Sequence, residues 1–264
     1  MMKRVIALMF HHVAADGQEG PAVGDPFYRI RASELEQLLS ELRQLGSQTV
    51  SSRAFRAWQQ GSVVLPERAM VLTFDDGYAS HFDVVVPLLL RYRFSATFFI
   101  AVERIGRAGY LTWEQLRKLT FLGMEIGSHG LSHRPLTALS QEELVRELSE
   151  SKRHLEGRLG VPVRALAVPG GFWNRAVTEA TQQAGYDAVW ASTVGTNGQD
   201  TNPHALRRVV VRPGFSTKRV IAMVEGWQPA FWWAANQQAA IRLLKRLLGV
   251  YRYEQLKRLV VPEA

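Results

Sequence analysis

The chain has 264 residues, 47% of them hydrophobic, which is enough to bury one substantial core. No cysteine is present, which excludes disulfides and thiolate metal ligands. The formal net charge of +8 suits a phosphate-bearing lipid or a nucleic acid, but no nucleic-acid-binding motif accompanies the basic residues, so we expect no nucleic-acid partner.

The first predicted element is a strand over Val5–Phe10, an unbroken apolar run. Lys3 and Arg4 precede it, as basic residues precede the apolar part of a signal peptide. The run is too short for that apolar part, leads directly into His11 and His12, and has no small-residue cleavage site. We therefore interpret it as the first barrel strand and expect a cytoplasmic protein.

Helix and strand patterns alternate through the middle of the chain. Ser33 begins a stripe of leucines at helical spacing that Gly46 ends, which predicts a capped amphipathic helix. Two capping-box pairs predict further helices, Thr112 with Gln115 and Ser140 with Glu143, ended by Gly123 and Gly160. Short β-rich runs lie between, at 69–74, 95–100, 124–128, 164–168, 187–191 and 207–211. Such alternation implies a parallel sheet, and about seven units are enough to close a barrel.

Two of these predicted strands end in residues that can bind a metal. Thr73–Gly77 reads Thr-Phe-Asp-Asp-Gly, and Ser128–His133 reads Ser-His-Gly-Leu-Ser-His. Asp-Asp-Gly after a strand is also a common turn, and a lone His-x-x-x-His is a weak signal. Their joint occurrence at strand ends, where α/β folds gather their chemistry, favours a metal hydrolase.

The acidic and imidazole side chains divide into two roles. One carboxylate and two histidines form the ligand set of an open divalent-metal site, so we assign Asp76, His129 and His133 to the metal. Asp75 is then free to act as the general base on water. Zinc fits this ligand chemistry, and cobalt, nickel or manganese could occupy the same site.

At these residues the chain resembles the polysaccharide deacetylase family, the NodB-homology domain of carbohydrate esterase family four. The resemblance extends to Leu8–His11, Ala96–Phe99 and Leu166–Gly171, and it covers roughly residues 3–225. It implies a distorted (β/α)7 barrel and the same base and metal-ligand roles. It also implies an N-acetylated hexosamine, in a glycan or a glycolipid, as the substrate.

Some positions depart from the family pattern. Gly130 stands where the family carries Ser or Thr, so one local hydrogen bond is missing. Ala167 replaces an arginine that steadies the catalytic Asp, and Arg208 is our candidate for a replacement cation beside Asp75. Gly170 replaces a tyrosine that contributes its backbone N–H to the oxyanion hole, and a glycine can still donate there.

The general acid and the substrate contacts are less directly indicated. The family's late Leu-x-His motif is not visible, and His204 lies in a polar loop. His11, at the end of the first strand, is our candidate for protonating the leaving amine, although it could instead hydrogen-bond only loop backbone. We expect Pro169, Gly170 and Tyr78 around the substrate, and Tyr78, Trp173 or Trp190 could stack on sugar rings or serve only packing.

The composition changes after the predicted catalytic domain, residues 1–225. Gly226–Pro229 reads as a break, and Phe231–Trp233 as an exposed aromatic cluster. From Ala239 a helical period places apolar residues on one face: Ile241, Leu244, Leu248 and Tyr251. The remaining positions are strongly basic: Arg242, Lys245, Arg246, Arg252, Lys257 and Arg258. This tail, 226–264, suits the surface of an anionic membrane but is too charged to span one; the alternative is packing on the barrel or on a second subunit.

The sequence therefore predicts a metal-dependent enzyme that removes an N-acetyl group from a hexosamine in a glycan or lipid-linked sugar. One alternative is a catalytically degenerate barrel that binds glycan. The other is a non-haem iron enzyme, since two histidines and a carboxylate also suit that metal; the additional Asp75 and the lack of a cosubstrate motif favour hydrolysis. The sugar, its linkage and the oligomeric state stay open.

Overall fold

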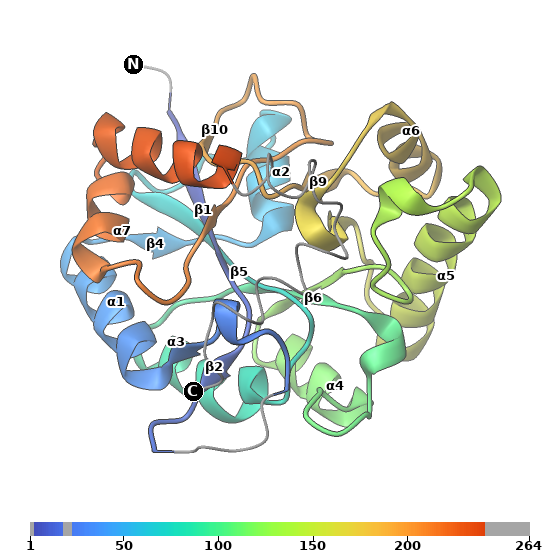
Figure 1. Ribbon diagram of the computed structural model, residues 1–264, viewed down its shortest axis with the longest axis horizontal. Coiled ribbons are helices and arrows are strands. Elements are labelled where there is room, and N and C mark those ends of the chain that lie inside the picture. Colours follow the sequence, from blue (N-terminus) through green and yellow to red (C-terminus); the bar gives the residue numbers. More distant parts are fainter. Residues whose placement is uncertain (1–2, 18–22, 241–264) are drawn as a thin grey trace.

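The computed structural model describes residues 3–17 and 23–240, and these form one α/β unit with helices around a central sheet (Figure 1). The strands of the main sheet are β1 (Val5–Phe10), β4 (Gln48–Thr49), β5 (Ala69–Phe74), β6 (Thr97–Ile100), β7 (Glu125–Ser128), β8 (Ala165–Ala167), β9 (Ala188–Trp190), β10 (Thr196–Asn197) and β11 (Val209–Val210). The helices are α1 (Ala32–Gln44), α2 (Ser52–Gln59), α3 (Val86–Arg91), α4 (Trp113–Phe121), α5 (Gln141–Leu159), α6 (Arg175–Gln183) and α7 (Thr217–Val224). A separate parallel pair joins β2 (Val13–Ala14) to β3 (Ile30–Arg31). Within 3–17 and 23–240, no helix has the length and apolar character needed to cross a bilayer.

Seven of the nine strands of the main sheet form a distorted barrel, and β4 and β10 add short pairings to β5 and β1. Parallel pairing runs in the order β1-β5-β6-β7-β8-β9, and β11 pairs parallel to β1 on the opposite side. A single parallel bridge between Trp190 and Leu206 joins β9 to the segment that leads into β11. The ring is therefore closed through one weak seam, and the predicted α/β barrel is confirmed.

Alternation along the strands separates two cores. On β1, Val5 and Ala7 pack inside the barrel with Val71 of β5, whereas Ile6 and Leu8 pack outward among the helices. Strand side chains alternate between the two faces of the sheet, and both faces of β1 are buried. Its residues are therefore apolar without interruption, and its sequence is a continuous hydrophobic run. This explains why β1 and β5 have the bounds that their sequence predicts.

Helix α2 covers the amino-terminal end of the barrel. The Ser52 N–H donates to Thr97 Oγ1 at 3.2 Å, and the Arg53 N–H to a Glu125 carboxylate oxygen at 3.1 Å. Thr97 and Glu125 are the first residues of β6 and β7, so the helix begins beneath those strands. Phe55 of α2 packs on Trp190 inside the barrel, with ring centroids 5.5 Å apart. Helix α2 thus closes the amino-terminal end of the barrel, and the opposite end, at the carboxyl ends of the strands, is left for the site.

The predicted helix signals have mixed outcomes. Both capping boxes are present, at Thr112 before α4 and at Ser140 before α5. The prediction that Ser33 begins the first helix is wrong, because α1 begins at Ala32 and Arg31 occupies the N-cap. Ser33 instead bonds through its hydroxyl and its N–H to the carboxylate of Asp16. A contact with a distant loop thus replaced the expected local cap.

The first part of the predicted tail packs on the barrel domain. Residues 228–240 are helical after a break at 225–227, so helix begins well before Ala239. Ala230 and Ala234 are buried in the main hydrophobic core. The expectation of an exposed aromatic cluster at 231–233 is correct only for Trp232, because Trp233 lies under Arg219 and against Phe215. The predicted basic helical face, from Ile241 onward, lies outside the described residues, and the division at residue 225 stays a prediction.

Candidate metal centre and active site

The candidate site lies at the carboxyl ends of β5 and β7. Asp75 and Asp76 follow the last residue of β5, and His129 follows the last residue of β7. Both strands pair in parallel with β6, so their carboxyl ends reach the same mouth of the barrel. The β-strand bounds therefore explain why residues about fifty positions apart meet in one place.

Asp76, His129 and His133 form a compact group of metal-ligand type. Their ligand atoms all lie within 4.8 Å of one another. Asp76 Oδ1 is 2.9 Å from His133 Nε2 and 3.7 Å from His129 Nε2. Asp76 and His129 are buried, and the His133 side chain retains 28% of its exposure. The three side chains therefore face one centre that is open to solvent on the His133 side.

The His129 ring is already oriented for a metal. Its Nδ1 lies 2.8 Å from the Ala167 carbonyl, and because a carbonyl only accepts hydrogen bonds, Nδ1 must carry the proton. Nε2 then presents a lone pair toward Asp76, the arrangement typical of histidines that bind metal. Burial lowers the pKa of His129 to about 4, so the ring is neutral at neutral pH. The donor set thus fits a divalent ion such as zinc.

Two of the three ligand candidates have unusual backbone conformations. Asp76 has φ of 78° and His133 has φ of 65°, in the left-handed region that non-glycine residues seldom adopt. Gly77 continues the turn with φ of 77°. Strain of this kind costs on the order of 1–3 kcal/mol for each residue and concentrates at functional sites. The strained backbone occurs here at the two residues whose side chains turn toward the same centre, which supports a functional role for that centre.

Asp75 is held inside the barrel by Arg208. Arg208 Nη1 donates to Asp75 Oδ1 at 2.7 Å and to Thr73 Oγ1 at 3.2 Å, and Nε donates to the Ala191 carbonyl at 3.1 Å. Both charged groups are buried. Burial acts to raise the pKa of Asp75, but the Arg208 charge, helped by His129 and His11, overcomes it and leaves the pKa below its ordinary value. Arg208 therefore occupies the place predicted for a cation beside Asp75.

Asp76 has two further partners besides the histidines. Arg104, on the short helix Val102–Arg104, donates to Asp76 Oδ1 at 2.8 Å, and the Tyr78 hydroxyl donates to Oδ2 at 2.9 Å. Tyr78 is only 3% exposed, so the expected stacking of its ring on a sugar is excluded in this conformation. Burial raises the pKa of the Tyr78 hydroxyl, which keeps it protonated as a donor. Tyr78 supports the metal centre rather than lining the substrate.

The other predicted substrate contacts have different outcomes. Trp190 is fully buried and donates to the Ser52 hydroxyl, so of its two predicted roles it serves packing and not sugar stacking. Trp173 is 43% exposed and stays available to a sugar ring. Pro169 is buried and begins the short helix Pro169–Gly171 directly after β8, where Gly170 is exposed with φ of 68°. Gly170 thus lies at the mouth, as its predicted role requires.

His11, which follows β1, is close enough to the two aspartates, Asp75 and Asp76, to interact with their charges. Burial lowers the pKa of His11 below the ordinary value. Its ring stacks on Tyr28 at 4.5 Å, and its Nδ1 is buried without a hydrogen-bond partner among the described residues. His204, by contrast, lies 3.4 Å from the Thr181 hydroxyl on α6. His11 is therefore the better placed of the two for proton transfer.

Two residues near the centre were not found from the sequence. Arg104 lies in a short segment that also carries the exposed Arg107, and nothing in the pattern distinguishes the two. Glu147 contacts the loop that carries His133. It did leave a signal, because it follows Leu144 by three residues on the buried stripe of α5, where a charged residue is out of place.

Known proteins show the relationships of this chain. Residues 62–189 match the family model described as polysaccharide deacetylase. A Bacillus subtilis (strain 168) protein described as "Putative polysaccharide deacetylase YxkH" is 26% identical over 218 residues, covering 83% of this chain and 75% of that protein. A peptidoglycan-N-acetylglucosamine deacetylase of Bacillus cereus is 33% identical over 124 residues, covering 47% of this chain and 56% of that one.

The fold is also that of a solved deacetylase structure. Streptococcus pyogenes deacetylase PplD in complex with acetate superposes with a TM-score of 0.78 and 21% sequence identity, covering 85% of this chain and 99% of that one. At this identity the likeness concerns the fold. Together with the motifs after β5 and β7, these findings lead to one conclusion: residues 62–189 belong to the polysaccharide deacetylase family, and most of the chain around them shares the fold of a deacetylase.

Proposed function

We propose that the protein is a metal-dependent hydrolase that removes the N-acetyl group from an N-acetylhexosamine of a glycan or a lipid-linked sugar. One observation carries this proposal. Three ligand-type side chains within 4.8 Å of one another lie next to a carboxylate that a buried arginine keeps ionised. A metal site beside a separate base is one arrangement that can hydrolyse an amide.

The chain's own residues supply the proton transfers. When bound, a divalent ion, most simply zinc, would polarise the N-acyl carbonyl and lower the pKa of an adjacent water. Asp75 accepts the proton of the attacking water, since Arg208 keeps it ionised. The Gly170 N–H is the candidate donor to the oxyanion. As the C–N bond breaks, the amine takes up that proton, directly or through His11, and acetate is released.

The substrate class rests on the relatives. The Bacillus cereus relative is named for N-acetylglucosamine in peptidoglycan, and this chain spans 56% of its length. We therefore propose an N-acetylated hexosamine polymer or its lipid-linked precursor. Trp173, after the Gly170 turn, is the exposed aromatic side chain nearest in sequence to the mouth and would stack on a sugar ring.

The decisive assay measures acetate release from N-acetylhexosamine oligomers, peptidoglycan and lipid-linked N-acetylhexosamine. We expect release that stops with a chelator and returns with zinc, cobalt, nickel or manganese. Asp75→Asn should lose on the order of 10²–10⁴ in rate while still binding metal. Asp76→Asn should lose metal affinity and activity together. Exposed Asp200→Asn is the matched control and should behave as wild type.

The same assay separates the alternatives. Tight metal binding without release of acetate from any acylated sugar would favour a glycan-binding barrel. Oxygen consumption with iron and an oxo-acid cosubstrate would favour a non-haem iron enzyme. His11→Gln tests the proton route: a fall in rate with unchanged metal affinity supports it, and an unchanged rate rejects it.

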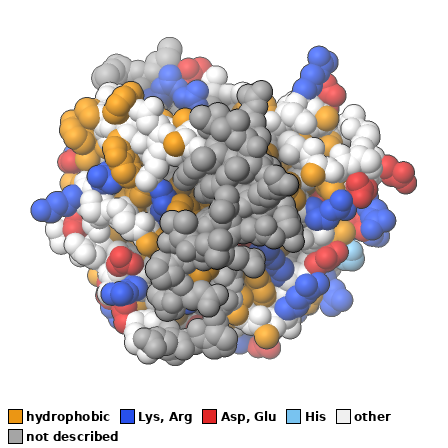
Figure 2. Space-filling model, in the orientation of Figure 1, with side chains coloured by type: hydrophobic (Ala, Val, Ile, Leu, Met, Phe, Trp, Pro, Cys, Tyr) orange, Lys and Arg blue, Asp and Glu red, His pale blue; other side chains and the backbone are white. Residues whose placement is uncertain are grey.

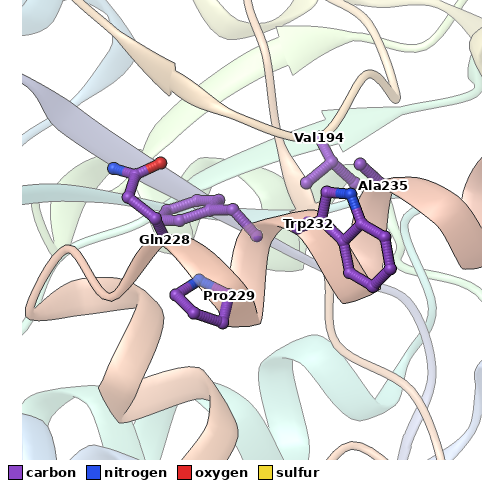
Figure 3. Close-up of a pocket in the computed structure, with 6 residues that line it drawn as sticks. Val194, Gln228, Pro229, Trp232 and Ala235 are labelled. Carbon is purple, nitrogen blue, oxygen red and sulfur yellow. The ribbon is translucent and has the colours of Figure 1, made fainter.

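We further propose that the protein works at an anionic membrane surface inside the cell. Figure 2 shows hydrophobic side chains gathered at the upper left, where Figure 1 places α7 and residues 228–240. Trp227 and Trp232 are 58% and 71% exposed. Trp232, Val194 and Pro229 line an apolar hollow of about 560 Å³. Figure 3 shows their side chains around it. Exposed tryptophans followed by a strongly basic sequence suit a lipid interface.

Vesicle binding tests this location. Retention on vesicles of phosphatidylglycerol should exceed that on phosphatidylcholine and fall as salt rises. The double variant Trp227→Ser and Trp232→Ser should bind more weakly, whereas Phe121→Ser, an exposed aromatic on α4, should not differ from wild type. If the protein is entirely soluble, with no retention on anionic vesicles at low salt, the membrane proposal is wrong.

A further inference from the structure

The segment that carries both histidine candidates is attached to α5 at two points, Ser128 and Ser132. His129 and His133 face Asp76, whereas Ser128, Gly130 and Ser132 make their contacts on another side. The loop therefore has one face for the proposed metal and another for a buried polar strip of α5.

The first attachment is a chain of hydroxyl groups at the end of β7. Ser128 Oγ donates to Ser151 Oγ of α5 at 3.0 Å, and the Gly130 N–H donates to Ser128 Oγ at 3.1 Å. Ser151 Oγ lies 3.1 Å from the Tyr186 hydroxyl, so the chain continues into the core. All three hydroxyl residues are buried. This fixes the backbone immediately on either side of His129.

The second attachment is a carboxylate, one turn earlier on α5. Glu147 accepts the Ser132 N–H at 2.7 Å on Oε1 and the Ser132 hydroxyl at 2.9 Å on Oε2. Its side chain is buried, with 6% of the residue exposed, and no ion pair to it is found in the described part of the chain. A buried carboxylate without a cation is costly unless hydrogen bonds compensate. Both carboxylate oxygens of Glu147 thus bond to Ser132, the residue that precedes His133.

Gly130 leaves the space that this carboxylate occupies. A Cβ atom at position 130 would lie 2.8 Å from Glu147 Oε1, and the residue has φ of 81°. A serine or threonine there would both strain the backbone and displace the carboxylate. Glycine at position 130 and the carboxylate of Glu147 therefore depend on each other: the space that a side chain at position 130 would fill is taken by the carboxylate.

We propose that Glu147 is a positioning residue, which holds Ser132 so that His133 keeps its imidazole directed at the metal. This rests on the proposed function in that it places an ion between Asp76, His129 and His133. His133 is the most exposed of the three and has a strained φ, so it is the ligand most in need of an external constraint.

Metal affinity is the direct readout. Zinc competition with a chromogenic chelator should show Glu147→Ala binding about 10–100-fold more weakly than wild type, the usual loss when a group that orients a ligand is removed. Ser132→Ala, which keeps the N–H bond, should lose about fivefold. Glu147→Gln can accept from the Ser132 N–H and donate to its hydroxyl, so it should bind within about threefold of wild type. Glu142→Gln, exposed on the same helix, is the control.

A cobalt spectrum separates positioning from stability. If Glu147 positions His133, the visible bands of the cobalt-loaded Glu147→Ala protein should change and those of Glu147→Gln should not. Folded Glu147→Ala with wild-type zinc affinity and spectrum overturns the proposal; if that variant does not fold, unchanged affinity in Ser132→Ala overturns it. Wild type that binds zinc but releases no acetate refutes only the proposed function. Wild type that binds no divalent ion refutes both.

Discussion

Asp75 and Asp76 are adjacent in the chain, yet they lie in opposite environments. Asp75 lies at the inner side of the barrel mouth, where its partner Arg208 is fully buried. Asp76 points to the mouth, where Arg104 and His133 keep 24% and 28% of their side-chain exposure. Both carboxyl groups have a lowered pKa: the charge of Arg208 outweighs the effect of burial at Asp75, and contacts with the histidine rings, first the hydrogen bond with His133, outweigh it at Asp76.

The difference shows how one turn separates two tasks. The strand alternation of β5 continues inward through Thr73 to Asp75, which meets Arg208 among the interior side chains. The positive φ of Asp76 breaks that alternation and turns its carboxylate toward the histidines. These environments suit the proposed roles: Asp75, paired with a buried cation, as the base, and Asp76, nearer the solvent, as a metal ligand.

The largest expected effect comes from breaking the buried pair. Arg208→Met should lower the free energy of unfolding by about 3–5 kcal/mol, because Asp75 is left as an unpaired buried charge. Urea denaturation at pH 7 measures this directly. Removing Asp75 as well, in Asp75→Asn with Arg208→Met, should restore part of the loss. A single variant as stable as wild type would show that the pair does not hold the barrel interior.

The sequence predicts those features of the fold and the site that depend on short-range patterns. The bounds of β1 and β5, both capping boxes and the placement of Asp75, Asp76 and His129 after strands follow from short-range patterns. Arg208 was also predicted, because it stands directly before the apolar run 209–211 and Asp75 needed a cation in place of the arginine that the family motif lacks here. The contacts of Arg104 with Asp76 and of Ser33 with Asp16 were not predicted, because neither residue stands at a strand end or in a motif that marks it. Long-range side-chain contacts leave no periodic signal.

Acid should disturb the histidine side of the site before the aspartate side. Burial lowers the pKa of His129 and of His81 to about 4 from an ordinary 6.5. Between these values the unfolded chain binds more protons than the folded protein, so stability falls as pH falls. The loss is roughly 3 kcal/mol at most for each ring. The carboxylates, with pKa values below 3.8, lose their contribution only at lower pH.

Thermal or urea unfolding of the metal-free protein from pH 7 to 3 measures these windows. His81→Gln keeps a donor for the His11 carbonyl, which His81 Nε2 meets at 2.8 Å. It should flatten the slope between pH 6.5 and 4 by about 1.4 kcal/mol per pH unit. Zinc should stabilise the protein strongly at pH 7 and weakly at pH 4, because protons compete for the ligands. A flat profile above pH 4 would contradict the neutral state of the buried rings.

A smaller effect should follow from removing the Tyr78 hydroxyl. Tyr78→Phe leaves Asp76 Oδ2 without its donor, and a hydrogen bond to a charged group contributes about 1.5–3 kcal/mol. We expect the lower end in stability, together with weaker zinc binding, because the carboxylate loses one of its constraints. Tyr110→Phe is the matched control, since Tyr110 stacks on Tyr78 at 5.3 Å. Equal zinc affinity in both variants would remove Tyr78 from the support of the metal centre.

The smallest effect should come from the mouth-side arginine, and it should have the opposite sign. Arg104 donates to Asp76 Oδ1, the oxygen that also faces both histidine rings. A cation at that oxygen competes with a metal ion for the same charge, so Arg104→Met should strengthen zinc binding by about fivefold or less. Its stability should change by at most about 1 kcal/mol, because the pair is partly exposed. Arg107→Met, in the same segment, controls for the loss of general positive charge. Weaker zinc binding in Arg104→Met would instead mean that the arginine orients Asp76 for the metal. Arginines would then hold both aspartates in place, and the two carboxylates would differ only in that the partner of Asp75, Arg208, is fully buried.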